Sequence, residues 1–196
     1  MPRALNSGTV PVLAASKGVR YRSSCSRGGL LPFPDYPCNA RSFVRLDAGL
    51  LPYWHTLFDI CPGLLKVDPP EGLELFRRFM IWAYRNHPAL DWTYYVSVCR
   101  WLLTSPYRDR VTAEHIEAFM VAAAAMWVAT DVSEARGLVL AWQPMSTLII
   151  EWKAGARGKA VIDDSEGLPA PPWNFSWSPL TGRGGAGFRR WLPVPG

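Results

Sequence analysis

Several signals that would define a functional class are missing from this sequence. No apolar run reaches the roughly 18 residues that a membrane-spanning helix requires. The four cysteines, Cys25, Cys38, Cys61 and Cys99, form no C-x-x-C pair and have no histidine at zinc-ligand spacing. The glycine-rich stretch 182–187 lacks the pattern of a phosphate-binding loop. We therefore expect a non-enzymatic protein with no metal or cofactor and with four free cysteines.

Lysine is also scarce, with 4 Lys against 17 Arg, whereas the chain contains 10 Trp and 18 Pro. Arg and Trp are favoured where planar side chains contact phosphate groups, bases or partner proteins. A biased coding sequence explains the same composition equally well. Free cysteines predict a reducing compartment, the cytoplasm or the nucleus.

The net charge of +5 is distributed unevenly along the chain. Residues 1–45 contain seven basic side chains and one acid, Asp35, whereas residues 46–154 contain nine basic and twelve acidic ones. Residues 155–196 contain five basic and three acidic side chains. A basic arm on a mildly acidic body can neutralise nucleic-acid phosphates, and anionic lipid headgroups attract it by the same Coulomb force. An arm that only improves solubility fits the pattern as well.

The N-terminal 34 residues contain no acid and are rich in Arg and Ser. This composition is typical of organelle transit peptides, so targeting by this arm is an alternative interpretation. Gly8, Pro11 and Gly18 would interrupt the amphipathic helix that such a peptide forms.

The distribution of Pro, Gly and apolar residues predicts three parts. Residues 1–42 form a basic irregular arm, which includes the extended segment Leu31–Pro37. Residues 43–162 form a globular helical domain with a β-hairpin, and residues 163–196 form a Pro/Gly/Trp-rich tail.

Helix signals recur through the central part. Apolar spacing predicts a short helix at 50–60 and longer ones starting at Asp68, Asp91 and Thr112. The β-branched and aromatic residues of 138–142 and 146–152, separated by Gln143-Pro144, predict an antiparallel hairpin. The fold class is therefore α+β and mainly α, with a core of three to four helices, a C-terminal β-hairpin and irregular basic ends.

The basic ends carry the predicted binding residues. We expect a nucleic-acid-binding or assembly protein, such as a viral coat, matrix or accessory protein, that binds RNA or single-stranded nucleic acid. In single-strand binders, Arg neutralises phosphates and aromatic rings stack on bases. The candidate residues are Arg20, Tyr21, Arg22, Arg27, Arg183, Phe188, Arg189, Arg190 and Trp191.

Two other functional classes remain open. In a protein-interaction adaptor, Trp173 and Trp177 would contact the partner. In a peripheral membrane protein, the basic ends would bind an anionic membrane surface. Separately, the nearly all-apolar helix at 112–130 predicts burial in the core or self-association as a homo-oligomer.

Overall fold

The structure is a computed structural model that describes residues 48–69, 71–154, 168–181 and 187–195. All of these described residues belong to one compact unit. The predicted arm, residues 1–42, lies outside the described residues.

The elements follow the predicted order of helices and then strands. The helical part consists of the 3₁₀ turn η1 (Ala48–Leu50), α2 (Leu51–Trp54), the π-helical turn η2 (His55–Asp59), α3 (Leu64–Val67), α4 (Leu73–Asn86), α5 (Thr93–Thr104), the 3₁₀ turn η3 (Arg108–Arg110) and α6 (Ala113–Thr130). The strands are β1 (Gly137–Trp142), β2 (Thr147–Trp152), β3 (Phe175–Leu180) and β4 (Leu192–Pro193), and the 3₁₀ turn η4 (Gln143–Met145) joins the first two. The mainly helical α+β fold class is confirmed.

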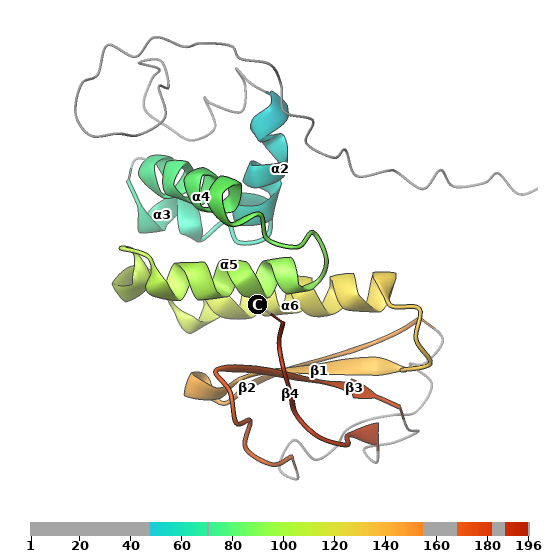
Figure 1. The fold of residues 1–196 in the computed structure, drawn as a ribbon. Helices are drawn as coiled ribbons and strands as arrows, with labels where there is room; N and C mark the ends of the chain where they lie inside the picture. The colour runs from blue at the N-terminus through green and yellow to red at the C-terminus, as the bar shows by residue number, and fades with distance from the viewer. Residues whose placement is uncertain (1–47, 70, 155–167, 182–186, 196) are drawn as a thin grey trace, which may run out of the picture. The chain divides into compact units, whose positions relative to one another are not determined.

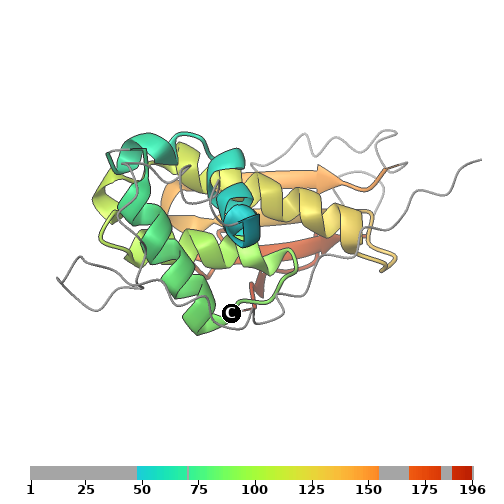
Figure 2. The ribbon, with the colours of Figure 1, turned by 90° about the horizontal axis from the view of Figure 1, so that it is seen from above.

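The helices α5 and α6 lie between the sheet and the layer of α2, α3 and α4 (Figure 1). Helix α6 packs on β1 and β2 and also on α5, while α2 packs on α4. Viewed from above, the helices lie in front of the strands, parts of which remain visible beside them (Figure 2). In the described residues, no helix combines the length and apolarity needed to cross a membrane.

The sheet is antiparallel and has the strand order β2-β1-β3-β4. The predicted hairpin is confirmed as β1 and β2, which pair from Gly137↔Trp152 to Trp142↔Thr147. Gly137 is needed at its position because an added Cβ would lie 2.5 Å from the Trp152 ring. Strand β1 is the second strand in the order, and every one of its six residues is buried.

Both faces of β1 are covered. Alternation along the strand places Val139 and Ala141 on one face, where they form a buried cluster with Leu180 and Trp191. Leu168, Phe188 and parts of β2 pack against that cluster. Leu138, Leu140 and Trp142 alternate to the opposite face, on which α6 packs. Burial on both faces explains why the sequence of β1 is continuously apolar rather than alternating.

The expectation of irregular structure after Leu168 needs correction. Residues 175–180 form β3, which pairs with β1 along its whole length, and residues 192–193 form β4. The physical reason is that β1 needs a second hydrogen-bonding partner and a cover for its face away from the helices, and this segment supplies both.

The start of α4 also differs from the prediction. The helix begins at Leu73 instead of Asp68, because Glu71 and Gly72 turn the chain with φ values of 47° and 71°. The Asp68 carboxylate still caps the helix, since its Oδ2 accepts hydrogen bonds from the backbone N–H groups of Glu74 (2.8 Å) and Leu75 (3.0 Å).

Thr112 is confirmed as the N-cap of α6, where it forms a capping box with His115. The backbone N–H of Thr112 donates to His115 Nδ1 over 3.0 Å. This bond requires an unprotonated Nδ1. Burial lowers the pKa of His115, although the nearby charge of Glu114 acts in the opposite direction.

We predict that the capping box makes stability depend on pH. The pKa of His115 is lower in the folded protein than in the unfolded chain, so the unfolded chain binds the proton first as the pH falls. The free energy of unfolding should therefore decrease below about pH 6.5, the ordinary histidine pKa. Urea unfolding between pH 7.5 and 5 measures this dependence. In His115→Gln, which keeps an acceptor at this position, the decrease should be smaller. An unchanged decrease in His115→Gln would contradict the account.

Candidate functional site

Four of the nine predicted nucleic-acid-binding residues, the consecutive residues 188–191, lie in the described part of the chain. Arg20, Tyr21, Arg22, Arg27 and Arg183 lie outside the described residues. Arg189 and Arg190 are exposed, as a phosphate-binding role would require.

The two aromatic candidates in this group are already engaged within the protein. Trp191 is 7% exposed, and its indole Nε1 donates a 2.6 Å hydrogen bond to the carbonyl oxygen of Pro169. Phe188 packs edge-on against Trp191, with ring centroids 4.9 Å apart. Trp191 is buried and Phe188 is half-buried, and both pack on the second face of β1. Their role in nucleic-acid binding stays a prediction.

The predicted partner-binding tryptophans differ in their surroundings. Trp173 is 43% exposed. Trp177 is half-buried, its ring lies 5.1 Å from that of Trp92, and its indole Nε1 donates to the carbonyl oxygen of Pro193 over 3.2 Å. Their role with a partner stays a prediction, as does self-association through 112–130, where Val121 is 48% exposed on α6. The membrane and compartment predictions also remain untested.

The candidate catalytic groups include one side-chain pair, His55 and Asp59. Among the described residues, no group of three or more His, Cys, Asp or Glu side chains could hold a metal ion. Cys61 and Cys99 are free, as predicted, and burial raises the pKa of each thiol. Cys25 and Cys38 lie outside the described residues. His55 is paired through Nδ1 with Asp59, whose other carboxylate oxygen accepts a 3.1 Å hydrogen bond from Trp54 Nε1.

The clearest candidate binding feature in the described chain is the outer edge of β2. This strand is at the end of the strand order, and among the described strands it pairs with β1 alone. The backbone N–H of Lys153 donates to the carbonyl of Arg136 over 2.9 Å, so these two residues form a hydrogen-bonded pair. In an antiparallel ladder, hydrogen-bonded and non-hydrogen-bonded pairs alternate along the strand. Consequently the backbone groups of Leu148, Ile150 and Trp152 point away from β1, toward the open edge.

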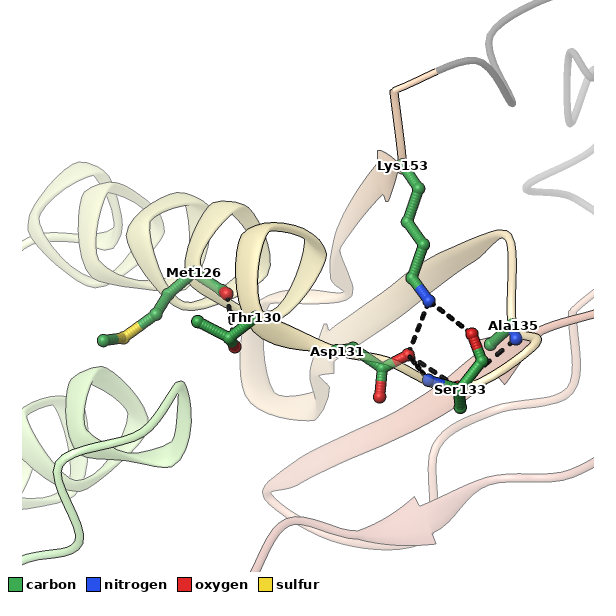
Figure 3. Close-up of polar contacts among 6 residues, drawn as sticks. All are labelled: Met126, Thr130, Asp131, Ser133, Ala135 and Lys153. Atoms are coloured by element: carbon green, nitrogen blue, oxygen red, sulfur yellow. Dashed lines mark hydrogen bonds and ion pairs between the residues drawn. The ribbon is translucent and has the colours of Figure 1, made fainter. Parts of the chain in front are cut away.

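One end of β2 is fixed to the end of α6. The Lys153 ammonium lies 2.7 Å from Asp131 Oδ2 and 2.7 Å from the carbonyl oxygen of Ser133 (Figure 3). It also lies 5.3 Å from the ring centroid of Trp127. Burial opposes ionisation of Asp131, but hydrogen bonds from Lys153 and Ser133 outweigh it and lower the pKa of this carboxyl.

The other end of β2 is held by a hydrogen bond from Thr147 Oγ1 to Glu117 Oε1 of α6, 3.2 Å long. Strand β2 is therefore held by α6 at both ends, while its outer backbone groups have no neighbouring strand among the described residues. A rigid strand with an open edge can bind another extended polypeptide through main-chain hydrogen bonds. The sequence predicted the strand itself but not its position at the edge of the sheet. That position follows from the pairing of β3 with the other side of β1, and β3 was not predicted.

In the described residues, the fold is thus a helical layer on a small antiparallel sheet whose edge strands are β2 and β4. A family model described as "Methanobactin biosynthesis cassette protein MbnC-like" matches residues 33–195. Because the match spans most of the chain, the protein belongs to this MbnC-like family. No curated protein is significantly similar in sequence.

Family membership overturns the predicted function. The prediction of a viral or RNA-binding coat, matrix or accessory protein is wrong, because the chain belongs to a family of biosynthesis cassette proteins. The error came from reading a basic charge distribution as a nucleic-acid signal. Charge alone reports on solubility and non-specific attraction, and it does not identify a function.

We predict that the Lys153–Asp131 pair stabilises the junction of α6 and β2. Lys153→Met should lower the free energy of unfolding by about 1–2 kcal/mol, because it removes two hydrogen bonds from a charged donor. Asp131→Asn provides the second single variant of a double-mutant cycle measured by urea unfolding. The double variant should lose less than the sum of the two single losses. Strictly additive losses would show that the two residues do not interact energetically.

Proposed function

We propose that this chain acts in methanobactin biosynthesis, or in the synthesis of a related product, as a non-catalytic subunit. The family match over residues 33–195 is the observation that carries the proposal. In this role the chain binds another polypeptide of the same biosynthetic system.

The open edge of β2 supports the binding role. Its outward backbone groups, at Leu148, Ile150 and Trp152, alternate with groups that pair with β1. The N–H of Trp152 already donates to Glu151 Oε1 over 3.4 Å, so an added antiparallel strand would pair with the outward donors and acceptors of Leu148 and Ile150. Because α6 holds both ends of β2, little conformational freedom is lost when such a strand binds.

Specificity would come from side chains on the two faces of the added strand. The side chains of β2 are half-buried from Thr147 to Trp152, so each is partly available to a neighbour on the open side. Cross-strand pairs of β-branched and aromatic residues are favourable in antiparallel sheets. We therefore expect the bound segment to be extended and to carry apolar residues at alternate positions.

The test is co-expression of the full chain with the other proteins encoded in its cassette, followed by purification and light scattering. Ile150→Pro removes one outward N–H and leaves the hydrogen bonds between β1 and β2 intact. It should weaken the complex at least tenfold. Ile150→Ala is the matched control, because it also removes apolar side-chain atoms but keeps the N–H, and it should retain binding. Equal binding by the two variants would exclude the β2 edge. Formation of product by this chain alone would exclude a non-catalytic role.

A further inference from the structure

Three consecutive main-chain carbonyl groups near the C-terminus accept hydrogen bonds from side chains. Trp177 Nε1 donates to Pro193 over 3.2 Å, while Arg100 donates to Val194 over 2.8 Å and to Pro195 over 3.0 Å. Arg100 comes from α5 and Trp177 from β3, and we call this pair of donors the carbonyl clamp. The chain after β4 runs from the sheet to α5 (Figure 1).

The bound segment is poor in hydrogen-bond donors. Pro193 and Pro195 have no backbone N–H, so this segment can form only a short ladder. It pairs with β3 at only two positions, Ser176↔Pro193 and Trp177↔Leu192. Its recognition depends instead on its carbonyl oxygens and on Val194, whose side chain is 4% exposed. Aromatic surfaces with side-chain donors bind proline-rich segments in this way.

The sequence of the bound segment occurs elsewhere in the chain. Residues 192–195 read Leu-Pro-Val-Pro, residues 168–171 read Leu-Pro-Ala-Pro and residues 31–34 read Leu-Pro-Phe-Pro. The second of these shares one of the three contacts, because the carbonyl of its first proline, Pro169, accepts a hydrogen bond from Trp191 Nε1. In both described L-P-x-P segments, an indole N–H therefore donates to the carbonyl of the first proline. The third segment lies outside the described residues.

We propose that the carbonyl clamp is a binding site for L-P-x-P segments, and that a proline-rich segment of a second polypeptide can replace residues 192–195 there. The chain's own segment is the occupant in this structure. The proposal goes beyond the proposed function and uses the opposite end of the sheet from β2.

The geometry explains why exchange is feasible. The internal segment is held by side-chain hydrogen bonds and by two ladder positions on β3, so its release breaks no hydrogen bond of β1. Its tethering keeps it at a high effective concentration, of the order of millimolar for a short flexible connection. A free peptide must therefore compete with it, and removal of the internal segment should increase the affinity for the peptide.

The experiment uses the full chain and a fluorescein-labelled Leu-Pro-Val-Pro peptide, with fluorescence polarisation as the readout. Val194→Arg places a charge at a buried position beside Arg100 and should displace the internal segment. We expect this variant to bind the peptide at least tenfold more tightly than the unmodified chain. A Leu-Ala-Val-Ala peptide is the matched control and should not bind.

A second substitution tests the clamp itself. Arg100→Lys, combined with Val194→Arg, keeps the positive charge but loses the planar group that reaches two carbonyls, and it should weaken peptide binding at least tenfold. Equal binding of the two peptides, or binding unaffected by Arg100→Lys, would overturn the proposal. Ile150→Pro should leave peptide binding unchanged, which separates this result from the test of the β2 edge.

A measurement on the unmodified chain covers the case in which Val194→Arg fails to fold. The backbone N–H resonance of Val194, which belongs to the internal segment, reports on whether residues 192–195 remain in the clamp. Excess Leu-Pro-Val-Pro should shift this resonance in a ¹⁵N-labelled sample, whereas Leu-Ala-Val-Ala should not. A resonance that responds to neither peptide, or to both equally, would also overturn the proposal.

Discussion

The burial of β1 on both faces is the constraint on which the rest of the structure depends. A strand in which all six residues are buried cannot be stable with helices on one side only. The helix-facing side is covered by α6, and the opposite side is covered by Trp191, Phe188 and Leu168 from the end of the chain. This arrangement brings residues about 50 positions apart in sequence into one core. The C-terminal segment is therefore part of the folded protein.

Much of the helical part could be predicted because its signals are local. Apolar spacing and the Thr112 cap place α6 correctly, and the turn at Gln143-Pro144 places the hairpin. Local signals fail at Asp68, where a left-handed turn at Glu71 and Gly72 delays the helix while the carboxylate still caps it. The π-helical turn η2 has no sequence signature of this kind.

Strand β3 could not be predicted, because its sequence lacks the usual signals of a buried strand. Two serines and a proline in Phe-Ser-Trp-Ser-Pro-Leu argue against a buried strand. The register resolves the conflict. Alternation along the β1–β3 ladder directs the missing N–H of Pro179 away from β1, so the proline removes no hydrogen bond between them. Ser176 and Ser178 are buried, and their side chains are small enough to fit beneath the C-terminal segment.

The same long-range pairing explains why the candidate sites were missed. Trp191 and Phe188 follow a glycine-rich stretch, so sequence reasoning placed them at the surface, whereas Trp191 is buried on the second face of β1 and the half-buried Phe188 packs against it. Conversely, Trp177 was selected as a partner-binding residue, and the structure shows its indole bound to a carbonyl near the chain end. The open edge of β2 becomes visible only once β3 is known to pair with the other side of β1.

Amide hydrogen exchange in β1 tests this account most directly. If both covers are integral to the core, Trp191→Ala should accelerate exchange at Val139 and Ala141 and, by the same factor, in the centre of α6, because all would open in one cooperative unfolding event. Faster exchange confined to residues 187–195, with β1 and α6 unchanged, would contradict the central claim.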